Sequence, residues 1–293
     1  MIVGNEYIIE LLAISLLAGG HTILEGLPGV AKTTIAKAFS KALNLEFSRI
    51  QLTPDILPAD IIGCVIYDQK ISEFKVKKGP IFSNIVLADE INRAMPKTQS
   101  ALLEAMQELQ VTIEGKTYEL PKPFMVIATM NPIETEGVFP LPEAQLDRFM
   151  LKIKIGYLDK SREIEFLKRK NMNLFNSVNK IVSKETLFKL MDCVKNIKVS
   201  DIIIEYIYDI VCSTRNHEKI LIGASPRASE HMLLASKALA FLRGRAYVIP
   251  DDVKEIAKVV LPHRLKIKPE YEVDNISSDD VIREVLSNIE VPK

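Results

Sequence analysis

With 293 residues, the chain is long enough to form one large domain or two smaller ones. Its composition, 47% hydrophobic and 26% charged, is ordinary for a globular protein, and its 38 basic residues balance 38 acidic ones. This balance gives no support for a dominant nucleic-acid-binding surface, although it leaves room for a local basic patch.

Three cysteines, Cys64, Cys193 and Cys212, lie far apart in the sequence. Their odd number and wide spacing argue against a disulfide framework or a zinc site. We therefore expect small buried side chains in a reducing compartment, which favours a cytoplasmic location.

In chain order, the first half alternates strands and helices. The runs at 85–88 and 124–128 are continuously apolar, which is typical of parallel strands covered on both faces. Residues 96–109 predict a helix that starts at a proline and carries one apolar face. The pattern indicates an α/β layered sheet, with strands expected at residues 22–25, 47–52, 85–88, 124–129 and 151–155.

A glycine-rich loop joins the first expected strand to a helix that includes residues 34–39. Backbone N–H groups in such a loop point at phosphate oxygens, and the helix N-terminus adds a positive dipole end. Lys32 would neutralise the outer phosphates and the Thr33 hydroxyl would bind Mg²⁺. A loop without function is the alternative. The residues expected to bind ATP here are Gly26, Pro28, Gly29, Val30, Ala31, Lys32, Thr33 and Thr34.

Ala31 stands where phosphate loops usually carry glycine. Its methyl group is tolerable only if the residue has ordinary helical backbone angles and the phosphate leaves room for Cβ. We therefore expect Ala31 to have helical φ and ψ.

Two adjacent acids, Asp89 and Glu90, end the apolar run at 85–88. The carboxyl edge of a parallel sheet is where ligands of α/β folds bind. Asp89 would hold Mg²⁺, through water, and Glu90 would polarise the attacking water. A solvated turn is the alternative for two acids that stand alone.

A second apolar run, at 124–129, ends in Thr129 and Asn131. Either side chain could orient the attacking water or touch the γ-phosphate, because the two strand ends should lie close together in one sheet. The alternative is an Asx turn before Pro132.

Two arginines are further candidates. Arg148 could form a plain ion pair with Asp147, or it could be an arginine finger that reaches the ATP of a neighbouring subunit. Arg227 opens a helix after Ser225, a good N-cap, and Pro226, which suits the first helical position. A cation is unfavourable at a helix N-terminus, so Arg227 faces either a bound phosphate or solvent.

After about residue 157 the strand pattern stops, and helices are expected at residues 161–170, 184–195, 200–217, 225–242, 251–260 and 278–289. The change predicts a nucleotide-binding domain at 1–157, a linker region at 158–183 that holds the Asn-rich stretch 171–179, and a helical domain at 184–293.

These motifs together resemble the MoxR family of AAA+ ATPases. The most specific stretches are 26–33, including Ala31, then 79–82, 88–94 with 96–106, and 141–149; the similarity extends from Val3 through 223–227 to 261–264. The resemblance implies an α/β AAA+ P-loop core with a parallel five-stranded sheet, followed by an all-α lid domain. It also implies that 26–33 is the Walker A loop, Asp89 and Glu90 the Walker B acids, Asn131 sensor 1, Arg148 the arginine finger and Arg227 sensor 2.

The family carries an insertion in its second helix, matched by residues 60–78, and a hairpin before sensor 1, matched by 111–120 with a turn at 114–116. The resemblance implies a ring, hexameric in form, that uses ATP and Mg²⁺ as a chaperone-like motor. Proteins with a von Willebrand factor A domain are the implied partners, with maturation or metal insertion in a client as the outcome.

Three alternatives share parts of this pattern. A metal-chelatase ATPase subunit has the same architecture and a different client. A DNA-acting AAA+ motor is disfavoured by the hairpin at 111–120, where Glu114 and Glu119 outnumber Lys116, although residues 70–78 are more basic. A small-molecule P-loop kinase fits poorly with the helical second half and the two arginines. The four histidines, His21, His217, His231 and His263, show no metal-ligand spacing.

Overall fold

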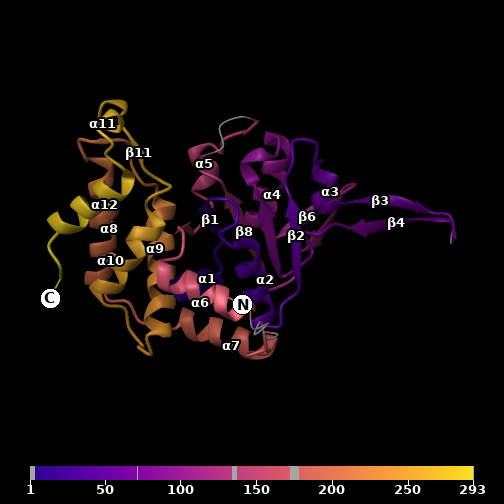
Figure 1. Cartoon of the computed structure of the whole chain (residues 1–293), viewed down its shortest axis with the longest axis horizontal. Coiled ribbons are helices and arrows are strands. Elements are labelled where there is room, and N and C mark those ends of the chain that lie inside the picture. Colours follow the sequence, from indigo (N-terminus) through magenta and orange to yellow (C-terminus); the bar gives the residue numbers. More distant parts are fainter. Residues whose placement is uncertain (1–3, 71, 134–136, 172–177, 293) are drawn as a thin grey trace. The chain divides into compact units, whose positions relative to one another are not determined.

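The computed structural model describes residues 4–70, 72–133, 137–171 and 178–292 (Figure 1). Most of the Asn-rich stretch, residues 172–177, and Val3 of the family-like start lie outside the described residues. The chain divides into two compact units. Unit 1 comprises Met1–Leu12, His21–Leu141 and Ile153–Phe188, and unit 2 comprises Ala13–Gly20, Pro142–Lys152 and Lys189–Lys293. The predicted domain limits at residues 157 and 183 stay predictions.

A parallel sheet of five strands forms the centre of unit 1, as the sequence predicts, in the order β2-β5-β8-β1-β9. The two central apolar runs are the most deeply buried, and every residue of β5 is buried. Burial on both faces is what a continuous apolar run requires, because each side chain of the strand then meets a covering helix. The five strands are β1 (Thr22–Gly26), β2 (Phe47–Gln51), β5 (Ile85–Asp89), β8 (Met125–Met130) and β9 (Leu151–Ile155).

The helices of unit 1 follow the strands in the alternation that the sequence predicts. In α2, the buried side chains Ile35 and Phe39 are four residues apart and therefore lie on one face. α4 begins at Pro96, as expected, and Leu109, the C-cap residue that follows its last helical residue, takes the left-handed conformation. The helical segments that lie wholly or partly in this unit are α1 (Glu6–Leu17), α2 (Lys32–Ala42), α3 (Pro58–Ile62), the 3₁₀ turn η1 (Ile91–Arg93), α4 (Pro96–Glu108), α6 (Lys160–Asn171) and α7 (Lys184–Lys195).

Two hairpins interrupt the alternation. β6 (Gln110–Ile113) and β7 (Lys116–Glu119) form the expected hairpin, and Glu114 and Gly115 at its tip both have positive φ, 46° and 77°. Two positive φ values in succession are the mark of a tight hairpin turn. The insertion at 60–78 contains a second hairpin, β3 (Gly63–Asp68) paired with β4 (Glu73–Lys78), which extends away from the sheet (Figure 1). Its alternating strands were not predicted from the sequence.

Unit 2 is mainly helical, but the expectation that strands end near residue 157 is wrong in one detail. β10 (Ile220–Ile222) and β11 (Lys266–Ile267) form a two-stranded antiparallel sheet. Strands of two or three residues are too short for an alternating pattern to show in the sequence. The described helices that lie wholly in this unit are α5 (Glu143–Leu146), α8 (Asp201–Arg215), α9 (Pro226–Leu242), α10 (Pro250–Val260), α11 (Pro269–Val273) and α12 (Ser278–Asn288).

The cysteines differ from expectation in their burial. Cys64 and Cys193 are exposed and Cys212 is partly buried, and all three are free thiols. Cys64 lies on β3, where a two-stranded hairpin is too thin to have an interior. None of the helices in the described part of the chain is both long enough and apolar enough to cross a membrane.

Candidate active site

The glycine-rich loop lies between β1 and α2. Gly29 has φ 86°, a left-handed value that glycine adopts without a steric penalty. The expectation for Ala31 is wrong, because its φ of 64° and ψ of 22° are left-handed rather than helical. A left-handed residue with Cβ costs about 1–2 kcal/mol, so the loop holds Ala31 in a conformation that glycine would take more easily.

Ala31 is also the N-cap residue of α2 and makes no side-chain cap hydrogen bond. A methyl group cannot accept from the N–H groups of the first helical turn. Those N–H groups carry the positive end of the helix dipole, which is the arrangement that binds a phosphate.

Lys32 connects the loop to the ends of two strands. Its Nζ donates to the carbonyl oxygen of Gly26 at 2.5 Å and to that of Met130 at 3.4 Å. The ammonium group therefore lies at the carboxyl edge of β1 and β8, which are neighbours in the sheet.

Asp89 and Thr129 meet at the same edge, as the order of the strands requires. The Thr129 hydroxyl donates to Asp89 Oδ1 at 2.5 Å and accepts from the backbone N–H of Glu90 at 2.9 Å. Thr129 has no exposed surface, and Asp89 is 8% exposed. Thr129 thus fixes both acids, which is a different role from the contact with water or phosphate considered from the sequence.

Arg49 contacts the other oxygen of the Asp89 carboxylate. Its Nε and Nη2 donate to Asp89 Oδ2 at 3.0 and 2.7 Å, and Nη2 also donates to Gln51 at 2.5 Å. Sequence analysis missed Arg49, because nothing in the sequence shows that β2 lies beside β5. The register places Arg49 opposite Leu87 and Gln51 opposite Asp89.

Glu90 has a left-handed backbone, with φ 59° and ψ 53°. Its Oε2 accepts from Gln51 Nε2 at 3.0 Å and lies 3.3 Å from Arg93 Nε. A non-glycine residue in this region costs about 1–3 kcal/mol and persists where the surroundings fix it, as the Thr129 hydroxyl does for the Glu90 N–H. Its carboxylate is partly exposed.

Asn131 follows β8 and is 7% exposed. Its Oδ1 accepts from the backbone N–H of Ile133 at 3.3 Å, which is the Asx-type contact considered as the alternative reading. The side chain is therefore held by its oxygen at the end of the strand that also carries Thr129.

A cavity of about 320 Å³ lies beside the loop within unit 1. Tyr157 and Phe166 supply aromatic surface, while Asn5 and Glu163 supply polar atoms. A mainly apolar cavity with a few polar groups suits a flat aromatic ligand. Its remaining lining residues are Pro28, Gly29, Val30, Ala31, Gly156 and Leu158.

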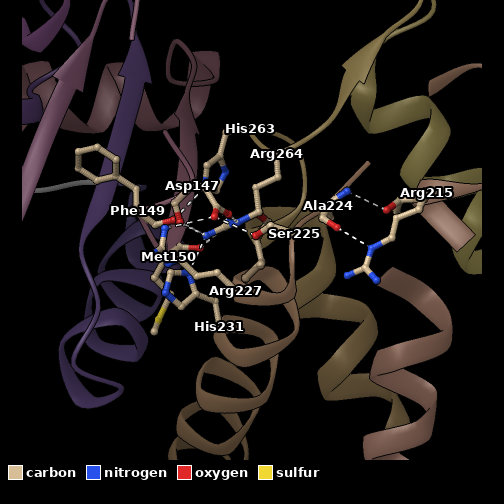
Figure 2. Close-up of polar contacts among 12 residues, drawn as sticks. Asp147, Phe149, Met150, Arg215, Ala224, Ser225, Arg227, His231, His263 and Arg264 are labelled. Carbon is tan, nitrogen blue, oxygen red and sulfur yellow. Dashed lines mark hydrogen bonds and ion pairs between the residues drawn. The ribbon is translucent and has the colours of Figure 1, made fainter. Parts of the chain in front are cut away.

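The two arginine candidates, Arg148 and Arg227, belong to unit 2, and Figure 2 shows that Asp147 contacts Arg227. Asp147 Oδ2 accepts from the Ser225 hydroxyl at 2.8 Å and from Arg227 Nη1 at 3.3 Å, and Oδ1 accepts from Arg264 Nε at 2.8 Å. Arg148 is the next residue in the chain and is partly buried.

Two expectations about the start of α9 change as a result. Ser225 is the N-cap residue by position, but it makes no side-chain cap bond, and its hydroxyl contacts Asp147 instead. Arg227 faces a carboxylate of its own chain, a choice that the sequence reading did not consider. That carboxylate offsets the unfavourable position of a cation at the helix N-terminus.

The donors at the loop and at the β5 end fit Mg²⁺. Thr33 offers a hydroxyl and Asp89 a carboxylate, and oxygen atoms are the ligands that this ion prefers. Within the described residues, no three His, Cys, Asp or Glu side chains gather into a metal-binding group. A magnesium ion that bridges protein and triphosphate needs no such group.

The chain is similar to known proteins along most of its length. The model of the ATPase family associated with various cellular activities (AAA) matches residues 21–151, and that of the AAA lid domain matches residues 212–285. Chaperone MoxR1 of Mycobacterium tuberculosis is 44% identical, over 100% of this chain and 80% of the relative. Uncharacterized protein YeaC of Bacillus subtilis is 45% identical, over 100% of this chain and 92% of the relative.

A crystal structure at 2.00 Å of a candidate ATPase from Cytophaga hutchinsonii superposes with a TM-score of 0.93 and 45% identity. The superposition covers 100% of this chain and 92% of the chain from Cytophaga hutchinsonii. The loop, the acid pair and the lid match define the class of AAA+ P-loop ATPases. Within that class, the chain belongs to the MoxR family.

Proposed function

We propose that this MoxR-family ATPase hydrolyses ATP with Mg²⁺ in a ring of identical subunits and uses the energy to remodel a protein client. The observation that carries the proposal is the group formed by Lys32, Asp89 and Thr129 at one edge of the sheet, with the Glu90 N–H held by the same Thr129 hydroxyl. Positive, metal-binding and water-activating groups side by side are what hydrolysis of a triphosphate requires.

The loop residues would bind the phosphates through their backbone N–H groups, and Lys32 would exchange the carbonyls of Gly26 and Met130 for phosphate oxygens. Thr33 and Asp89 would hold Mg²⁺, and the ion supplies neutralisation of the developing phosphate charge. For Asp89 to do so, its Oδ2 must leave Arg49 or share it, whereas Thr129 keeps Oδ1 fixed.

We assign to Glu90 the role of polarising the water molecule that attacks the γ-phosphate. Its carboxylate is partly exposed and can accept a proton or a hydrogen bond from water, while its backbone is fixed by Thr129. Asn131 would orient the same water or the γ-phosphate from the neighbouring strand end. The cavity lined by Tyr157 and Phe166 would take the adenosine.

Arg148 would complete the site of a neighbouring copy, and Arg227 is the second positive group that we assign to the reaction. A guanidinium supplied by a neighbour stabilises the charge of the transferring phosphoryl group, by about 10³–10⁵ in rate. Activity would then depend on assembly, and a hexamer is the ring that we propose.

The test is the ATPase rate per subunit against protein concentration, for the wild type, Glu90→Gln and Arg148→Ala. We expect the wild-type rate per subunit to rise with concentration and both variants to be inactive in the assembled state. Equal rates per subunit at all concentrations, with Arg148→Ala unaffected, would contradict an active site that is shared between two subunits.

We propose that the motor acts on a protein client in the cytoplasm. Its partner in this role would be a protein with a von Willebrand factor A domain. The β3–β4 hairpin supports a protein client, because Tyr67 and Phe74 stack edge to face on it at 5.2 Å and are 53% and 76% exposed. Capture with Glu90→Gln in ATP, compared with Lys32→Ala, would identify the client. Recovery of DNA instead, at physiological salt, would contradict a protein client.

A further inference from the structure

Arg264, which follows α10, is a buried arginine that has no role in the function proposed above. Its side chain is 1% exposed, and burial lowers the pKa of its guanidinium to about 10 despite the nearby Asp147 carboxylate. Burying an arginine costs several kcal/mol unless its donors are satisfied, and an apolar side chain of similar volume often stabilises a protein as well. The contacts that Arg264 makes therefore need a reason beyond packing.

Those contacts concentrate on three residues that flank Arg148 in the chain: Asp147 before it, and Phe149 and Met150 after it (Figure 2). Arg264 Nε donates to Asp147 Oδ1 at 2.8 Å, and Nη2 donates to the main-chain oxygens of Asp147 and Phe149 at 3.0 and 2.6 Å. Nη1 donates to the Met150 oxygen at 3.3 Å and also to Val260 of α10.

Three residues of the segment 147–150 are also held through their own N–H groups. The N–H groups of Asp147, Arg148 and Phe149 donate to carbonyls of the preceding turn, at 2.9, 3.2 and 3.0 Å. Residues 147–149 belong to no regular element, so these bonds and Arg264 together fix their main chain.

Arg148 lies in the middle of this fixed segment. Phe149 and Met150, which follow it, are 0% and 1% exposed, and the ring of His263 adds a second contact to the Phe149 oxygen at 2.9 Å. Because the main chain is fixed on both sides of Arg148, the position of its Cα and the direction in which its side chain leaves the main chain are also fixed.

Arg264 also orients the carboxylate that contacts Arg227. Because Arg264 takes Asp147 Oδ1, the second oxygen is directed to Ser225 and Arg227. His231 Nδ1, on α9, accepts from Arg264 Nη2 at 2.6 Å and ties the guanidinium to the same helix.

We propose that Arg264 is a positioning residue for Arg148, and that its guanidinium holds residues 147–150 so that Arg148 can complete the site of a neighbouring subunit. This inference rests on the proposed role of Arg148 in a neighbour's site. Only the planar fork of arginine can donate to a carboxylate and three main-chain oxygens at once, so lysine cannot replace it.

The experiment mixes subunits. Arg264→Lys keeps the charge and loses the fork, and Arg245→Lys is the matched control because Arg245 forms a bidentate pair with Asp252 elsewhere in unit 2, at 2.7 and 2.5 Å. Alone, Arg264→Lys should lose about 10-fold or more in kcat, a part of the effect of removing an arginine finger, with the KM for ATP little changed. Arg245→Lys should keep the wild-type rate.

Mixing with Glu90→Gln subunits separates positioning from general damage. Glu90→Gln cannot hydrolyse ATP but still offers Arg148 to its neighbour, so it should restore hydrolysis at the intact sites of Arg148→Ala and of Arg264→Lys subunits alike. Damage to the folding of unit 2 would not be repaired by a neighbour.

The outcomes distinguish the two proposals. If Glu90→Gln fails to rescue Arg148→Ala, the shared site itself is wrong. If it rescues Arg148→Ala but not a folded Arg264→Lys, or if Arg264→Lys keeps the wild-type rate, the positioning role of Arg264 is overturned. Should Arg264→Lys not fold, Asp147→Asn keeps the main-chain contacts of Arg264 and weakens the ion pair. Asp147→Asn should then show a smaller loss of kcat with the same rescue, and an unchanged kcat would count against the proposal.

Discussion

Two aspartates, each paired with an arginine, show how differently the two units use the same interaction. Asp89 in unit 1 meets Arg49, whose side chain is 49% exposed, whereas Asp147 in unit 2 meets Arg264, whose side chain is 1% exposed. An exposed partner can leave at little cost, and a buried one cannot. In our proposal, the first carboxylate exchanges its partner for a ligand, and the second holds residues 147–150 in place.

The largest effect should come from the aspartate whose partner can leave. Asp89→Asn keeps the shape of the side chain and removes the charge, so we expect the ATPase rate to fall by about 10²–10³-fold, because one charged contact in the transition state is lost. Thermal unfolding should change little, since Thr129 can still donate to the amide oxygen. A wild-type rate of phosphate release would remove Asp89 from the reaction.

The buried pair should dominate stability instead. Arg264→Met removes the buried donors to Asp147 Oδ1 and to several main-chain oxygens, and we expect a loss of about 3–5 kcal/mol in the free energy of unfolding. Arg49→Met should cost no more than about 1 kcal/mol, because its guanidinium is half exposed. Urea unfolding of both variants measures the contrast, and equal losses would refute it.

A third effect is a pH dependence from unit 1, at the opposite end of the sheet from the acids. His21 directly precedes β1 in the chain. It accepts from the Val126 N–H through Nδ1 and contacts the Met106 oxygen through Nε2, and burial lowers its pKa to about 4. Its ordinary pKa of 6.5 applies in the unfolded chain, which therefore binds the proton first as the pH falls.

The stability due to neutral His21 should be complete above pH 6.5 and decline toward pH 4, by about 3 kcal/mol over the whole range. Unfolding free energies of the wild type and His21→Gln between pH 7.5 and 4 measure this contribution. The difference between the two proteins should shrink with acid, and a difference that stays constant would contradict the argument.

The smallest effect should come from the phosphate loop. Ala31→Gly removes the Cβ that makes the left-handed conformation costly, and the net gain should be about 0.5–1 kcal/mol after the greater freedom of glycine in the unfolded chain is counted. Ala38→Gly, inside α2, is the control and should lose about 1 kcal/mol. A loss in both would mean that Ala31 is not strained.

The sequence predicted most of the sheet and the place of the glycine-rich loop between β1 and α2, because both follow from local sequence patterns. Continuous apolar runs mark β5 and β8, and glycines with Lys32 and Thr33 mark the loop. The sequence could not predict the contacts of Arg49 and Arg264, because each arginine lies far along the chain from the aspartate that it binds. The separation is 40 residues for Arg49 and 117 residues for Arg264. Which strand lies beside which, and which loop meets which helix end, is decided by packing of the whole chain.

Ala31 shows a different limit. An alanine considered by itself favours helical backbone angles, and the sequence therefore predicted helical φ and ψ for Ala31. The loop imposes the left-handed conformation instead, because the chain must turn from β1 into α2 within residues 27–31. Tertiary constraints overrode the preference of a single residue at a cost that the fold can bear.

The narrow base of the β3–β4 hairpin makes the insertion a separable module. A Cβ on Gly79 would lie 2.7 Å from the nitrogen of Gly63 and 2.2 Å from the oxygen of Ile61, so the chain enters and leaves the hairpin at one point. Segments with adjoining ends can be lengthened, shortened or exchanged without moving the sheet. The hairpin can therefore diverge, or be grafted from a relative, while the ATP-hydrolysing core stays unchanged.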